Sequence, residues 1–174
     1  MRAHSDIRVL DLDAAAPAPF GLTDSERAAI DAAASHYENP RAASIDALKI
    51  VQRSRGWVCD DAIDAIAQRL RIAASDVEGV ATFYSLIFRA PVGRHVIKVC
   101  DSLACFLSGG ERLRDALVAA LGVEVGQTTP DDRFTLLPIC CLGACDIAPA
   151  AMIDDDTLGP MSADRIGALL ERYP

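Results

Sequence analysis

The order of apolar and polar positions divides the chain into a helical first half and a mixed second half. Apolar residues recur at helical spacing in segments near residues 23–37, 42–53 and 61–70 and from residue 75 onward. Two of these segments begin with the pattern of a capping box, Thr23-Asp24-Ser25-Glu26 and Ser75-Asp76-Val77-Glu78. Short helices are marginal alone and must pack together. Residues 23–90 are therefore predicted to form a small helical bundle.

The pattern changes after Ala90-Pro91-Val92-Gly93. Strands are predicted at residues 95–100, 133–139 and 151–153, and a turn at residues 154–156 leaves room for a short fourth strand. Helices are predicted at residues 110–121, closed by Gly122 as the C′ residue, and from Ser162 onward. The fold class is thus α+β, with the helical bundle followed by an α/β domain over residues 91–174. Residues 1–22, interrupted by Pro17, Pro19 and Gly21, are predicted to be an N-terminal arm.

Composition excludes several classes of function. A net charge of -8 without clusters of lysine and arginine argues against nucleic acid as a partner. No apolar run approaches the roughly 20 residues that a membrane-spanning helix needs, so we expect no direct membrane insertion. The first 20 residues carry acids within an Ala/Pro-rich segment and do not match a secretory signal. Without export, cysteines serve metal binding or redox chemistry more often than disulfides.

Cysteine placement is the strongest chemical signal in the chain. Five of the six cysteines fall in two short segments, Cys100 to Cys105 and Cys140-Cys141 to Cys145, and each segment follows a predicted strand. Strands that end at one edge of a sheet can bring such loops together. Four thiolates from two loops suit zinc or an iron–sulfur cluster better than a hard cation.

The spacing of these cysteines bears on the occupant. The first pair is C-x4-C, and the second is C-x3-C from Cys141 or C-x4-C from Cys140, whereas zinc sites commonly use two C-x2-C pairs. A two-iron cluster accepts longer loops, although the plant-type ferredoxin pattern fails because position 108 is Ser. A structural zinc module with four cysteine ligands, serving protein interactions, stays open as an alternative. Neighbours in an extended chain point to opposite faces, so one of Cys140 and Cys141 is expected to be buried without binding metal.

Motifs for nucleotide chemistry are absent. The sequence has no G-x-G-x-x-G after a strand, no G-x-x-x-x-G-K-[ST] and no C-x-x-C pair. We therefore expect no site for NADH, for a nucleoside triphosphate or for dithiol catalysis on this chain.

The two cysteine segments, Val99-Cys100-Asp101-Ser102 through Cys105 and Cys141-Leu142-Gly143-Ala144-Cys145-Asp146, resemble a known cluster-binding signature. It is that of the thioredoxin-like [2Fe-2S] ferredoxin family, in the branch that serves NADH-quinone oxidoreductase, the respiratory complex I, as its E subunit. The similarity extends through residues 37–44, 55–58 and 77–84 and to Leu169-Leu170-Glu171-Arg172-Tyr173. The resemblance implies a thioredoxin-like fold for residues 91–174 and one [2Fe-2S] cluster held by Cys100, Cys105, Cys141 and Cys145.

The function that the resemblance implies is one-electron transfer. NADH would reduce FMN on a partner flavoprotein subunit, and the cluster would accept single electrons from that FMN. The chain would have no catalytic residues and no activity alone, as an electron carrier among the other peripheral-arm subunits of the complex. We expect it in the cytoplasm, peripheral to the inner membrane through the complex. The alternative within redox chemistry is the equivalent subunit of an NAD-linked hydrogenase or formate dehydrogenase.

Overall fold

The computed structural model describes residues 21–174, so the arm predicted for residues 1–22 lies almost wholly outside the described residues. The α-helices are α1 (Asp24–Ala34), α2 (Ser44–Arg55), α3 (Asp60–Leu70), α4 (Ala74–Phe83), α5 (Leu103–Leu107), α6 (Gly110–Leu121) and α7 (Ile166–Leu170). The strands are β1 (His95–Cys100), β2 (Phe134–Ile139), β3 (Ala151–Ile153) and β4 (Asp156–Leu158). Short 3-10 turns lie at Pro40–Ala43, Cys145–Ile147 and Ala163–Arg165.

One of the two predicted capping boxes is present. The Glu26 backbone N–H donates to the Thr23 hydroxyl at 3.1 Å, and the Thr23 N–H donates to the Glu26 carboxylate at 2.8 Å, so α1 begins as predicted. The second prediction is wrong: α4 begins at Ala74, two residues earlier than a cap at Ser75 would place it, and it has no side-chain cap. The prediction that α1 reaches residue 37 is also wrong. Ser35 donates its hydroxyl to the Ala32 carbonyl at 2.7 Å, a local bond that favours a turn over further helix.

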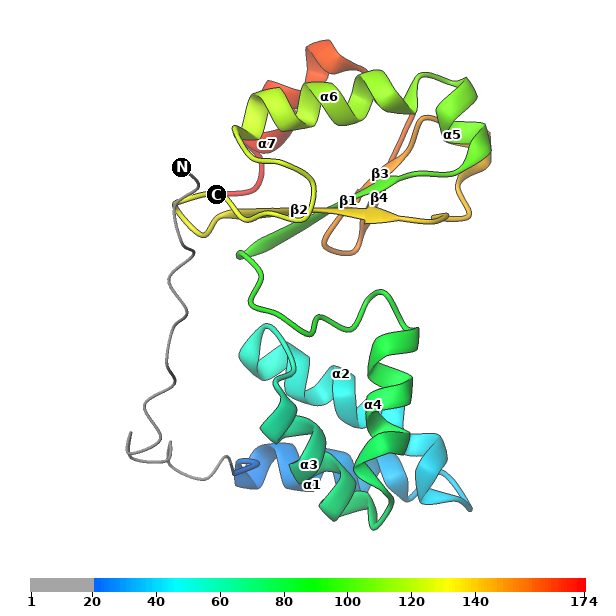
Figure 1. The fold of residues 1–174 in the computed structure, drawn as a ribbon, viewed down its shortest axis with the longest axis vertical. Helices are drawn as coiled ribbons and strands as arrows, with labels where there is room; N and C mark the ends of the chain where they lie inside the picture. The colour runs from blue at the N-terminus through cyan, green and yellow to red at the C-terminus, as the bar shows by residue number, and fades with distance from the viewer. Residues whose placement is uncertain (1–20) are drawn as a thin grey trace, which may run out of the picture.

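The four helices α1 to α4 enclose an apolar core of their own. They lie together in the lower half of Figure 1. Leu48 and Val51 of α2, Ile66 of α3 and Val77 of α4 have no exposed surface. Each helix buries one apolar face, and the shared core supplies the stability that each short helix lacks alone.

The second half contains a mixed sheet in the order β2-β1-β3-β4. β1 pairs in parallel with β2 and antiparallel with β3, and β3 and β4 form a hairpin. Helices α6 and α7 cover one face of this sheet (Figure 1). Leu113 and Leu117 of α6 pack there against Ile97 and Leu136 of the sheet in a second apolar core. The predicted α+β class is confirmed, and the short fourth strand is present.

The segment between α4 and β1 joins the two cores (Figure 1). In the middle of this segment the Arg89 guanidinium contacts Asp60 at 2.6 Å and Glu78 at 2.9 Å, both in the helical bundle. At its other end the Gly93 N–H donates to the Thr135 hydroxyl on β2 at 2.7 Å. The boundary at residues 90 and 91 stays a prediction.

Candidate metal centre

The two cysteine loops leave the sheet from neighbouring strand ends. Cys100 is the last residue of β1 and is in register with Ile139, the last residue of β2, and the two strands are parallel. The Asp101 N–H donates to the Ile139 carbonyl at 2.8 Å, which holds the two exits together. The carboxyl ends of parallel strands are where ligand sites of α/β sheets collect. The topology therefore places residues 100–105 and 140–145 at one edge of the sheet.

The first loop carries its second cysteine on a helix that the sequence pattern did not predict. Helix α5 places Cys105 beneath the surface, with 1% of its area exposed, and Cys100 is also buried. A five-residue helix is too short to show a helical period, and only the Ser102 at its start is a residue type favoured at caps. The Ala150 N–H lies 3.5 Å from the Cys105 sulfur, and a buried amide in this position can donate to a thiolate.

The second loop lies at the surface. Cys140, Cys141 and Cys145 are all exposed, so the expectation that one of the adjacent pair is buried is wrong. The chain leaves β2 at Ile139 and stays at the molecular surface, where neither neighbour meets a covering element. Gly143 has φ +75°, a backbone conformation that side chains rarely adopt, and its N–H donates to the Cys141 sulfur at 3.3 Å.

The pKa shifts of the thiols reflect interactions between the two cysteine loops. Burial raises the pKa of Cys105, and the neighbouring Cys100 and Cys145 thiols raise it further. Proximity to Cys141 is the main reason that the pKa of Cys145 is raised, and Cys100 contributes as well. Burial opposes ionisation of Cys100, but hydrogen bonds from Ser102 and the Leu142 backbone outweigh it and lower the pKa. Cys140 takes part in none of these interactions.

These four thiols fit an iron–sulfur cluster by the chemistry of their donors. They are soft sulfur donors from two loops, and the Cys105 and Cys141 sulfurs face backbone N–H groups of the kind that hydrogen-bond to cluster-bound sulfur. Within residues 21–174, no three histidine, cysteine or acidic side chains are grouped as a site for a single metal ion. The assignment of Cys100, Cys105, Cys141 and Cys145 as the ligands stays a prediction.

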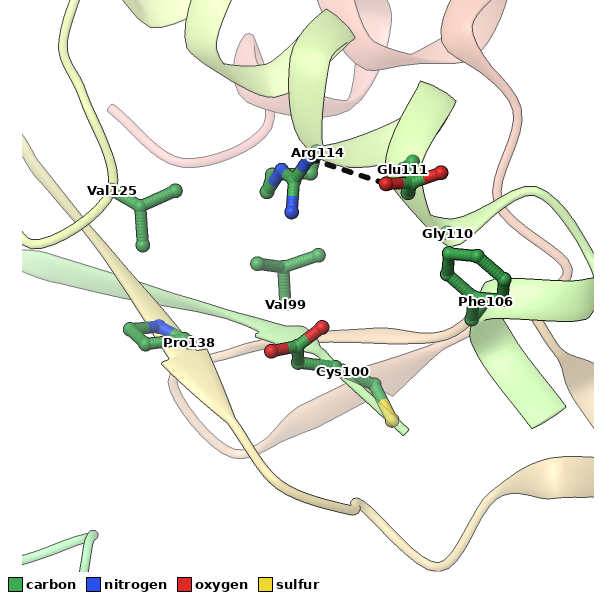
Figure 2. A pocket seen from close by; sticks show the side chains of 9 residues that line it. Val99, Cys100, Phe106, Gly110, Glu111, Arg114, Val125 and Pro138 are labelled. Carbon is green, nitrogen blue, oxygen red and sulfur yellow. Dashed lines mark ion pairs between the residues drawn. The ribbon is translucent and has the colours of Figure 1, made fainter. Parts of the chain in front are cut away.

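A cavity of about 290 Å³ lies beside Cys100, between the sheet and the start of α6. Figure 2 shows Val99 and Pro138 on the sheet side, Arg114 and Glu111 on the helix side, and the Cys100 sulfur turned away from Arg114. The Arg114 guanidinium lies 3.9 Å from the Glu111 carboxylate. The cavity therefore borders the predicted cluster site: Cys100 lines it, whereas Cys105, Cys141 and Cys145 do not.

The surface beside the cysteine loops is apolar. Three large side chains of α5 are exposed: Leu103 by 72%, Phe106 by 53% and Leu107 by 74%. Apolar groups gathered in this way on one short helix are typical of a surface that another protein covers.

Comparison with known proteins identifies relatives of the whole described fold. Residues 30–174 match the family model of thioredoxin-like [2Fe-2S] ferredoxins. The chain is 60% identical to the E subunit of NADH-quinone oxidoreductase from Pseudomonas aeruginosa and to that from Escherichia coli strain K12. Each match extends over 154 residues, which are 88% of this chain and 93% of the relative.

A solved structure of an NAD+-reducing [NiFe]-hydrogenase in the H2-reduced state is also similar, with a TM-score of 0.61 and 28% sequence identity. The match covers 72% of this chain and 22% of the hydrogenase chain. Among the described helices, none is both long and apolar enough to cross a membrane.

Proposed function

The chain belongs to the thioredoxin-like [2Fe-2S] ferredoxin family, and on that premise we propose that it is the electron-transfer subunit of an NADH-quinone oxidoreductase. Its cofactor is a [2Fe-2S] cluster. The observation that carries the proposal is the 60% identity to the E subunit of this oxidoreductase over 93% of the relative's length. Because the chain belongs to this family, we reject the alternative of a structural zinc module.

The role we assign to the cluster is to accept single electrons from FMN on a partner flavoprotein subunit that oxidises NADH. Such a cluster stores one electron at a time, so the two electrons of a hydride can pass singly to one-electron carriers. Cys100 and Cys105 are the proposed ligands on the protein side, and their burial excludes water. Cys141 and Cys145 are the proposed ligands on the exposed side.

The proposed partner surface combines the exposed cysteine loop with the apolar side chains of α5. An electron carrier must bring its cofactor close to the donor, so the partner has to cover the surface nearest the thiols. Leu103 and Leu107 are the most exposed apolar side chains there. We assign the chain to the peripheral arm of the complex, in the cytoplasm and peripheral to the membrane.

The test separates electron carriage from NADH oxidation. The purified full-length chain should contain two irons and two acid-labile sulfides, and dithionite should reduce it. NADH should not, since no dinucleotide motif is present in the sequence. Addition of the NADH-oxidising flavoprotein subunit should then permit reduction by NADH. Steady NADH turnover by the highly purified chain alone would contradict this division of roles.

The hydrogenase likeness supports a second candidate, the equivalent subunit of an NAD-linked hydrogenase, at lower identity. A strain that lacks this chain distinguishes the two. Its membranes should lose NADH-dependent quinone reduction if the proposal is right. Loss of H2-dependent NAD+ reduction, with quinone reduction retained, would favour the hydrogenase.

A further inference from the structure

Lys98 is a buried cation in the middle of β1, two residues before Cys100. Only 7% of its surface is exposed. The chain has a second lysine, Lys49, which is exposed on α2 in the helical bundle. Lysine is almost never fully buried unless its charge is compensated. The burial of Lys98 therefore requires a physical explanation.

The surroundings of Lys98 solvate its charge only in part. Its Nζ donates to the Asp154 backbone carbonyl at 2.9 Å, lies 3.9 Å from the Met152 sulfur, and lies 5.8 Å from the centre of the Phe88 ring. Within residues 21–174, Lys98 forms no ion pair with a carboxylate at 4 Å or less. The Asp154 side chain accepts a hydrogen bond from the Val96 N–H at 2.9 Å and contacts His95 Nδ1 at 2.7 Å.

Asp154 and its neighbour Asp155 act on Lys98 from a greater distance. Burial lowers the pKa of Lys98, and these two carboxylates oppose that shift. Asp155 is exposed at the turn between β3 and β4, where water screens its charge. The neighbouring groups therefore compensate the positive charge of the Lys98 ammonium only in part.

The strand geometry directs Lys98 and Cys100 to the same face of the sheet. Side chains alternate along a strand, so residues two apart share a face, and their Cα atoms are about 6.6 Å apart. Cys100 is buried as well, at 6% exposure. The Lys98 ammonium lies beside the Asp154 carbonyl, at the level of Val96, so about four residues of strand, or roughly 13 Å, separate it from Cys100. Both side chains are buried, so protein rather than water lies between them and screening is weak.

We propose that Lys98 sets the reduction potential of the cluster, raising it through the electrostatic attraction between its buried ammonium group and the electron that the cluster gains. This inference rests on the proposed function, because it takes Cys100 as a ligand. Reduction adds one negative charge to the cofactor and leaves the charge of Lys98 unchanged, so a nearby fixed cation stabilises the reduced form more than the oxidised form. Lys98 acts on the cluster through its charge and touches no substrate.

The expected size follows from Coulomb's law. A unit charge about 13 Å away, at an effective dielectric constant of about 20, changes a one-electron equilibrium on the order of tenfold. For a one-electron couple a tenfold change corresponds to ~59 mV.

The experiment is an EPR-monitored redox titration of the full-length protein with its cluster. Lys98→Met should shift the midpoint potential in the negative direction by an amount equivalent to about a tenfold change in the equilibrium. Lys98→Arg should leave the potential close to that of the natural protein, because the cation is retained. Lys49→Met removes an exposed lysine from the helical bundle and should leave the potential unchanged.

A second neutral variant separates charge from packing. Lys98→Gln keeps a donor that can reach toward the Asp154 carbonyl and should give the same negative shift as Lys98→Met. Unchanged potentials in both neutral variants, with full iron and sulfide content, would overturn the inference. Loss of the cluster from both neutral variants but not from Lys98→Arg would also overturn it, and would assign Lys98 a purely structural role. If the natural protein itself lacked the EPR signal of a [2Fe-2S] cluster, the proposed function would fail instead.

Discussion

Single backbone amides matter at this centre because they face sulfur. The Gly143 N–H donates to the Cys141 sulfur at 3.3 Å, and the Ala150 N–H lies 3.5 Å from that of Cys105. Amides that point at a thiolate stabilise negative charge on it, and such bonds are among the features that set the potential of a cluster. The positive φ of Gly143 turns the chain directly after this amide, on the way to Cys145.

The adjacent cysteines give a prediction at this scale. Cys141→Ala should abolish the visible absorption and the reduced-state EPR signal, because it removes a proposed ligand. Cys140→Ala should retain both, since Cys140 is exposed and takes no part in the interactions among the other four thiols. The two variants serve as each other's control, and the reverse result would move the ligand assignment by one residue.

At the scale of elements, a buried carboxylate joins α1 to α2. Glu26 is 4% exposed, and it accepts hydrogen bonds from Arg55 Nε at 2.7 Å and from the Ser54 hydroxyl. The Arg55 guanidinium is the main reason that the pKa of Glu26 is lowered from 4.5 to about 2. The same carboxylate closes the capping box with Thr23, so one charged side chain fixes both the start of α1 and its contact with α2.

The free energy of unfolding should therefore depend on pH through Glu26. A lowered pKa means that the ionised carboxylate favours the folded state. Its contribution is fully present above about pH 4.5 and is lost as the pH falls toward 2. Glu26→Gln should lower the free energy of unfolding at pH 7 by about 3 kcal/mol. Denaturant titrations of the variant and the natural protein should converge as the pH approaches 2.

Glu38→Gln is the matched control for this prediction, because Glu38 is an exposed glutamate just after α1. It should change the free energy of unfolding little at any pH. A Glu26→Gln effect that stayed constant from pH 7 to pH 2 would mean that its cause is packing and not charge.

At the scale of the whole molecule, the bundle and the sheet have separate apolar cores. The core of α1 to α4 runs from Leu22 to Ile87, and the sheet core begins at Ile97. The cysteines of the candidate centre lie outside the helices of the bundle and outside its apolar core. The stability of the bundle and the properties of the cluster should therefore respond to different substitutions.

Leu48→Ala tests this separation. Leu48 is fully buried in the bundle, so its truncation should lower the free energy of unfolding by roughly 2–5 kcal/mol. The absorption and EPR spectra of the folded fraction should be unchanged. Lys49→Ala, at the exposed neighbouring position, is the control and should alter neither property. A strong spectral shift in Leu48→Ala would show that the bundle reaches the cluster site.

The sequence by itself was sufficient for features that depend on local pattern or on the cysteine signature. The predicted bounds of β1 agree with the structure, as do those of α6 and its closure by Gly122. The family and its cofactor followed from the phrases around Cys100 and Cys141, and the family match confirms both. These features could be predicted because the relevant side chains lie within a few residues of one another.

Other features were decided only by the tertiary structure. Helix α5 is too short for a periodic signal, and it forms where the chain turns from β1 to α6. The exposure of both Cys140 and Cys141 was also decided there, because burial depends on which elements cover a loop. A lysine in a strand is ordinarily expected to face solvent, yet Phe88 from the connecting segment and the carbonyl of Asp154, 56 residues away, enclose Lys98. Contacts between distant segments leave no local pattern, and for that reason only the folded chain shows that the cation two residues before Cys100 is buried.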